Sequence, residues 1–164
     1  MLSLLLALAT TQTNAVPPPT CTVEIVPPEL AGWIDRAPLK ATANSAALAA
    51  AMLPPGKAVA VVLSPLSGVN FALTPAHAPA EGGFAGLLRV AIAQAGRYRI
   101  ALGSAAWIDL IRDGAALTPV AFGHGPTCST IRKQVDFDLT PGTYTLQLSG
   151  STTPAFNAMV ARLP

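Results

Sequence analysis

Charged and aromatic side chains are scarce in this sequence, and histidine and cysteine are scarcer still. Of its 164 residues 11% are charged and 5% are aromatic, and the formal net charge is +2. So small a net charge provides no electrostatic footprint for nucleic acid or an anionic lipid surface. Because the chain has two histidines and two cysteines, a metal site of several such ligands would need nearly all of them.

The sequence also contains no hydrophobic run of the about 20 apolar residues that a membrane span takes. The longest internal run, residues 46–53, ends at a proline pair. At the N-terminus, the short apolar run from Leu2 to Ala9 precedes small residues before a cleavage site after Ala15, which is typical of a signal peptide. We therefore predict a signal peptide over residues 1–15, an extended segment over 16–20, and one domain over 21–164 of a periplasmic or secreted protein.

The two cysteines form an even pair in a chain predicted to be exported. In an oxidising compartment such a pair is usually a disulfide, so we predict a bond between Cys21 and Cys128. It would close a loop of about a hundred residues and contribute about 4 kcal/mol in the chain-entropy model. If Cys128 were reduced, it could instead bind a soft metal together with His124.

Glycine and proline punctuate the chain about every ten residues after Gly56, which is typical of short strands in a β-sandwich. We predict an all-β, jelly-roll-like antiparallel sandwich of about eight to nine strands with at most one short helix, over residues 45–52. Asn44 or Ser45 would cap that helix. The expected strands cover residues 22–26, 58–63, 70–73, 87–93, 98–102, 107–112, 118–122, 133–139, 144–148 and 157–163.

A Gly-x-Tyr phrase occurs twice, at Gly96 to Tyr98 and at Gly142 to Tyr144, each time followed by alternating apolar residues. We interpret the copies as two nonidentical hairpins, and the pair Asp113-Gly114 as a further type I′ turn. Alternation places one face of each strand in the core. The predicted core residues are Leu88, Val90, Ile92, Tyr98, Ile100, Leu102, Val135, Phe137, Leu139, Tyr144, Leu146 and Leu148.

The phrases AGRYRIALG, WIDLIRDG and VDFDLTPGTYTLQLSG resemble the strands of pre-peptidase C-terminal domains, which are secreted bacterial β-sandwiches. This resemblance covers roughly residues 57–163. With HGPTCSTIRK at its centre, the chain is also similar to small exported proteins of sphingomonad-type bacteria that carry the name homogentisate 1,2-dioxygenase. That similarity implies a non-haem iron enzyme. Because such a site needs two histidines and a carboxylate, its ligands would be His77, His124 and Glu81.

The densest polar cluster lies in residues 124–133, a predicted loop. His124, Arg132 and Lys133 are candidate binding residues there, and Arg132 and Lys133 could hold a carboxylate or phosphate, with solvation of the basic pair as the alternative. Trp33 and Trp107 are candidate stacking platforms for sugars, and we expect at least one of them to be buried because the core is short of bulky residues.

Two further charged groups have competing interpretations. Arg89, Arg97 and Arg99 would form a basic stripe on one sheet face, either solvated or open to an acidic polysaccharide. Asp136 and Asp138 would share a strand face, either solvated or binding calcium with loop carbonyls. Among the serines there is no G-x-S-x-G nucleophile elbow.

These patterns favour a non-catalytic binding or accessory module that needs no cofactor. Its ligand would be a polysaccharide, a peptide or another protein of the cell envelope. The alternative is the iron dioxygenase implied by the second resemblance. The sequence sets no oligomeric state.

Overall fold

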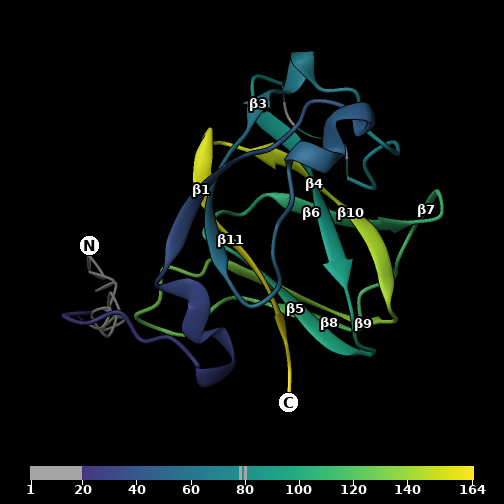
Figure 1. The fold of residues 1–164 in the computed structure, drawn as a ribbon. Coiled ribbons are helices and arrows are strands. Elements are labelled where there is room, and N and C mark those ends of the chain that lie inside the picture. The colour runs from purple at the N-terminus through teal and green to yellow at the C-terminus, as the bar shows by residue number, and fades with distance from the viewer. Residues whose placement is uncertain (1–19, 78, 80) are drawn as a thin grey trace, which may run out of the picture.

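Two β-sheets pack face to face in this computed structural model, which describes residues 20–77, 79 and 81–164 (Figure 1). The predicted signal peptide and residues 16–19 lie outside these residues. No helix in the described ranges is both long enough and apolar enough to cross a membrane. The described residues form three short 3₁₀ helices, η1 (Pro28–Trp33), η2 (Ser45–Ala50) and η3 (Leu66–Gly68), and eleven strands, β1 (Arg36–Lys40), β2 (Ala58–Val62), β3 (Ser64–Pro65), β4 (Phe84–Ile92), β5 (Gly96–Leu102), β6 (Trp107–Arg112), β7 (Ala115–Ala116), β8 (Ala121–Gly123), β9 (Lys133–Leu139), β10 (Gly142–Ser151) and β11 (Ala155–Arg162).

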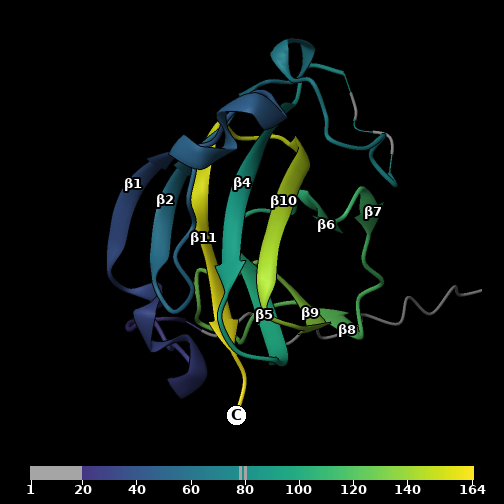
Figure 2. The same cartoon turned by 45° about the vertical axis from the view of Figure 1, so that its right-hand side comes forward.

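The strand order confirms the predicted all-β sandwich. One sheet runs β1-β2-β11-β5-β9-β8 and the other runs β3-β4-β10-β6-β7. Between β4 and β6, and again between β9 and β11, each strand lies in the sheet opposite to its predecessor, which is the wrapping of a jelly roll. Figure 2 shows β1 and β2 at one side of the sandwich, with β7 and β8 at the other. Only β1 and β2 pair in parallel among the described strands.

Strand alternation builds the core, since every second side chain of a strand points to the same face. All twelve predicted core residues are buried in a single cluster between the sheets. A second cluster lies under η1 on the outer face of the six-stranded sheet, where Leu30 and Trp33 cover Ala101 and Met159. Trp33 is fully buried, which confirms the expectation for one of the two tryptophans.

The two Gly-x-Tyr phrases are corners between the sheets, not hairpins as predicted. The first leads from β4 to β5 and the second from β9 to β10, and each of these connections changes sheet. At each corner the tyrosine hydroxyl donates to a backbone carbonyl four residues earlier, Tyr98 to Gln94 at 2.9 Å and Tyr144 to Thr140 at 2.7 Å. This hydrogen bond is the arrangement known as a tyrosine corner.

Other local predictions can also be compared with the structure. Asn44 caps η2 by accepting a hydrogen bond from the Ala47 amide, as predicted, although η2 is one of three short helices rather than the only one. Asp113 and Gly114 both have positive φ, 52° and 79°, in the turn between β6 and β7, as a type I′ turn requires. Residues 22–26 and 70–73 form no strand, contrary to prediction.

Candidate functional site

The open side of the sandwich, near β8, carries a small hollow between the two sheets. About 190 Å³ in volume, it is lined by Trp107, Ile108, Pro119, Phe122, Lys133 and Val135. A second hollow of about 220 Å³ shares Phe122 and Lys133 with the first and adds Ala105, Gly123, His124 and Arg132. We call the two hollows together the aromatic cleft.

The alternation of side chains along β9 places Lys133 in this cleft. Lys133 begins β9 and shares the inner face with Val135, Phe137 and Leu139, so its chain enters the sandwich where the apolar core ends. Its ammonium donates to the Ala106 carbonyl at 3.1 Å and lies 4.8 Å from the centroid of the Trp107 ring, within range of a cation–π interaction. Burial lowers the pKa of Lys133, although the charge of Asp109 opposes that shift.

No carboxylate of the described residues forms an ion pair with Lys133. An ammonium has three donors, and the Ala106 carbonyl takes one of them. Two donors therefore remain for a ligand at the point where the lining is otherwise apolar.

Trp107 forms the opposite part of the lining. Its side of the cleft is held by Asp109, whose carboxylate accepts from the Trp107 indole at 2.9 Å and from the Gln147 amide at 3.2 Å. Gln147 in turn accepts from the Ala72 and Leu73 amides, so that it fixes the segment leading to His77. Sequence reasoning missed both Asp109 and Gln147, because Gln147 alternates with the predicted core residues Leu146 and Leu148 and no role was assigned to Asp109.

Two partly exposed rings are available to a ligand at the cleft. Trp107 is 37% exposed and Phe122 is 83% exposed, while the His77 ring stacks on Trp107 at 5.2 Å between centroids. Phe122 was predicted only as a strand residue. An aromatic residue directly before Gly123 and His124 was the signal that could have identified it.

His124 and Arg132 lie at the two ends of the loop beyond β8. The His124 ring nitrogen Nδ1 donates to the Arg132 carbonyl at 3.1 Å, which closes the loop at its base. Arg132 is exposed and its guanidinium has no hydrogen bond or ion pair within the described chain. The structure thus brings together all four predicted binding residues, Trp107, His124, Arg132 and Lys133, around one cleft.

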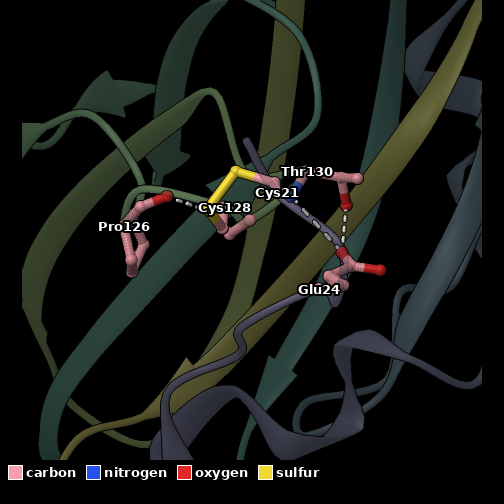
Figure 3. Close-up of a disulfide and its surroundings, with 6 residues drawn as sticks. Cys21, Glu24, Pro126, Cys128 and Thr130 are labelled. Atoms are coloured by element: carbon pink, nitrogen blue, oxygen red, sulfur yellow. Dashed lines mark hydrogen bonds between the residues drawn. A yellow bond between two sulfur atoms is a disulfide. The ribbon is translucent and has the colours of Figure 1, made fainter. Parts of the chain in front are cut away.

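The far side of that loop is tied down by the predicted disulfide. Cys21 and Cys128 are bonded, with 5.2 Å between their Cα atoms and a sequence separation of 107 (Figure 3). Beside the bond, the Glu24 carboxylate accepts from the Thr130 hydroxyl, and the dashed lines of Figure 3 mark this contact. The Trp33 indole donates to the same two side chains, Thr130 at 2.8 Å and Glu24 at 3.1 Å.

The predicted iron ligands do not form a metal site. Among the described residues, no three histidine, cysteine, aspartate or glutamate side chains lie close enough to hold a metal ion. His77 stacks on Trp107 and His124 bonds the Arg132 carbonyl, and Glu81 does not complete a group with them. These residues therefore do not fit a two-histidine, one-carboxylate iron centre.

The predicted basic stripe on one sheet face is wrong, and of the two interpretations of Asp136 and Asp138 neither describes Asp136, which is buried in an ion pair with Arg99. Arg97 and Arg99 pair with Asp138 and Asp136 across β5 and β9, each at 2.8 Å, so the two sets of charges neutralise each other. Arg89 lies in the other sheet, on β4. The Asp138 pKa is held below its ordinary value by its hydrogen bonds to Arg97.

In comparisons with known proteins, no family model and no curated protein matches this chain.

Proposed function

We propose that this protein is an exported, non-catalytic binding module and that the aromatic cleft is its binding site. The observation that carries the proposal is Lys133: a partly buried ammonium over a partly exposed tryptophan, with no carboxylate paired to it in the described chain. The ligand is expected to present an anionic group beside a flat apolar surface.

The surroundings of Lys133 support this ligand chemistry. An apolar lining excludes water and strengthens the attraction between an ammonium and an anion. Trp107 and Phe122 supply rings on which a flat group can stack, and Arg132 extends the positive charge along the cleft beside His124. A carboxylate-bearing peptide, an acidic sugar and an acidic segment of an envelope protein all share this chemistry.

Export is supported by the disulfide, since such bonds persist in oxidising compartments. The location in the periplasm or outside the cell and the resemblance to pre-peptidase C-terminal domains both stay predictions. No cofactor takes part in this proposal.

The test is an equilibrium titration with phenylacetate, which combines a flat ring with a carboxylate, against the neutral phenylacetamide. We expect saturable binding of phenylacetate that weakens about tenfold in Lys133→Met, because a charge-assisted hydrogen bond is lost. Trp107→Ala should weaken it by a comparable factor. The exposed Lys57 of the loop before β2 provides the matched control, and Lys57→Met should leave binding unchanged.

Trigalacturonate and maltotriose form a second pair of probes, one anionic and one neutral, for the sugar class. If neither phenylacetate nor trigalacturonate binds saturably, or if Lys133→Met leaves their affinity intact, the cleft is not the binding site. Iron-dependent oxygen uptake with homogentisate would overturn the non-catalytic assignment.

A further inference from the structure

We infer that strand β8 accepts an extended peptide as an added strand, with an apolar side chain of the peptide in the aromatic cleft and a carboxylate of the peptide on Lys133. This inference rests on the proposed function and selects one ligand class for it. The recognition would combine main-chain hydrogen bonds along a sheet edge with side-chain pockets beside it.

The four sheet edges of the described chain differ in how they are protected. Soluble proteins block exposed edges with charges, prolines or very short strands, because unpaired main-chain groups recruit other chains. β1 contains Arg36, Pro38 and Lys40, and β3 and β7 have two residues each, with Pro65 in β3. β7 and β8 both lack charge and proline, and β8 (Ala121–Gly123) is the longer of the two, with an exposed aromatic side chain at its centre.

β8 also exposes apolar surface instead of hiding it. All three of its residues are exposed, and Phe122 is the most exposed large apolar side chain in the described chain, at 83%. Val120, just before the strand, is 47% exposed. An edge of this kind is a template for pairing with another strand.

The register of β8 connects its edge to the cleft. Phe122 stands opposite Val135 on β9, and both side chains line the first hollow. Since strand side chains alternate between the two faces, a strand beyond β8 would present every second side chain to the cleft side of the sheet. The hollow of about 190 Å³ is large enough for a phenyl ring, because an apolar cavity on the order of 150 Å³ already holds benzene.

Charge near β8 favours an acidic partner. The carboxylates of the neighbouring strand β9 are paired, Asp136 with Arg99 and Asp138 with Arg97. Asp109 acts on Lys133 through its charge but accepts its hydrogen bonds from Trp107 and Gln147. Lys133 and Arg132 have no ion pair in the described chain. A peptide offers a carboxylate from either its own C-terminus or an acidic side chain. A sugar could use the rings and cations but would leave the β8 main chain unpaired, so the open edge favours a peptide.

The experiment compares acetylated hexapeptides of alternating threonine and valine that end in phenylalanine. One has a free C-terminal carboxylate, one a C-terminal amide, and one a further aspartate followed by an amide. We expect the free acid or the aspartate peptide, according to the source of the carboxylate, to bind the full protein about tenfold more tightly than the plain amide. Equal affinity of all three would overturn the role of Lys133.

Strand addition is tested by N-methylating alternate amides of the tighter peptide, which removes main-chain donors and leaves the protein untouched. We expect at least about a tenfold loss of affinity, and about a tenfold loss also in Phe122→Ala, whose exposed side chain makes misfolding no concern. If the methylated peptide binds as well as its parent while phenylacetate still binds, β8 pairing is wrong and the cleft assignment survives. If phenylacetate fails as well, the proposed function itself fails.

A second copy of this chain is the competing occupant of β8. Sedimentation equilibrium without peptide should show a monomer. A concentration-dependent dimer that Phe122→Lys dissolves would overturn the peptide proposal in favour of pairing between two β8 strands.

Discussion

The two tryptophans have opposite surroundings. Trp33 is completely buried, and its indole N–H is bonded to Glu24 and Thr130 beside the disulfide. Glu24 is itself paired with Arg36, whose guanidinium lies 5.9 Å from the Trp33 ring. Trp107 is partly exposed, and the cation over its ring has no paired carboxylate within the described residues.

We call Trp33 and its partners Glu24, Thr130 and Arg36 the clamp, because their contacts with one another hold the fold together. The surroundings of Trp107 form the proposed binding site. Around Trp33 each polar group already has a partner within the protein, so a ligand could only displace existing bonds. Around Trp107, Lys133 has no ion pair in the described chain, because the nearby Asp109 carboxylate accepts from the Trp107 indole and the Gln147 amide instead. A partly buried charge without a paired counter-ion costs stability, and in our proposal a ligand supplies that counter-ion to Lys133.

The largest expected effect is on stability, from the buried tryptophan. Trp33→Ala should lower the free energy of unfolding by about 3–5 kcal/mol, because a fully packed aromatic side chain is lost. Trp107→Ala should cost only about 1 kcal/mol, since its ring is partly in water. Urea unfolding followed by circular dichroism measures both. Equal losses would contradict the distinction between clamp and site.

Removing the disulfide should have the next largest effect on stability. Cys21→Ser with Cys128→Ser should lower the free energy of unfolding by about 2–4 kcal/mol, because the bond closes a loop of 107 residues. Lys133 and Trp107 stand on strands rather than in the tied loop, so phenylacetate affinity should change less than about threefold. Loss of phenylacetate binding in a double mutant that is still folded would show that the clamp shapes the site.

Glu24 should make the free energy of unfolding depend on pH at acidic pH. Its hydrogen bond from Thr130, helped by the charge of Arg36, holds the pKa of Glu24 below the ordinary 4.5. The unfolded chain then binds more protons than the folded one between these two pKa values, so stability is present above about pH 4.5 and falls as pH decreases through the folded pKa. Glu24→Gln should reduce the fall in the free energy of unfolding between pH 6 and pH 3, measured by urea titrations. The same fall in the variant would mean that the protonation of Glu24 is not coupled to folding.

Lys133 should cause a smaller pH dependence of the free energy of unfolding at alkaline pH. Burial holds its pKa below the ordinary 10.5, so the folded chain loses this proton at lower pH than the unfolded chain. Stability from this group therefore rises as pH increases through the folded pKa toward 10.5. Lys133→Met should remove that rise and Lys57→Met should keep it, as measured by urea unfolding from pH 8 to 10.5. If Lys133→Met keeps the rise, Lys133 is not its source.

Much of the fold was predictable because alternation is a local signal. The twelve core residues from Leu88 to Leu148 were identified from it, and Lys133–Leu139 and Trp107–Arg112 match the expected strands residue for residue. The sheet that each strand joins is not local information. The Gly-x-Tyr corners therefore resembled hairpins until the sheets were seen to change.

The errors have physical causes of the same kind. β1 was missed because Arg36, Pro38 and Lys40 disfavour a strand, yet its parallel pairing with β2 holds it as a protected edge. Residues 22–26 alternate like a strand, but the disulfide and the Glu24 contacts hold them as a strap instead. Arg97 and Arg99 seemed exposed because their aspartate partners come from a strand nearly forty residues away.

The candidate site was predictable in part. His124, Arg132 and Lys133 stood together in the sequence, and Trp107 was a separate candidate that the topology brings beside them. Asp109 and Gln147 were not recognisable, because their role depends on which loop covers the outer face of the five-stranded sheet. Local pattern shows that such residues face away from the core and does not show what lies above them.

The most direct test follows both tryptophans in one spectrum. In ¹⁵N-labelled protein each indole N–H gives its own resonance, assigned with Trp107→Phe, and phenylacetate is titrated into the sample. The Trp107 resonance should shift and saturate while the Trp33 resonance stays in place. A shift of Trp33 alone, or of neither indole, would contradict the assignment of the cleft as the binding site and of the Trp33 cluster as a clamp.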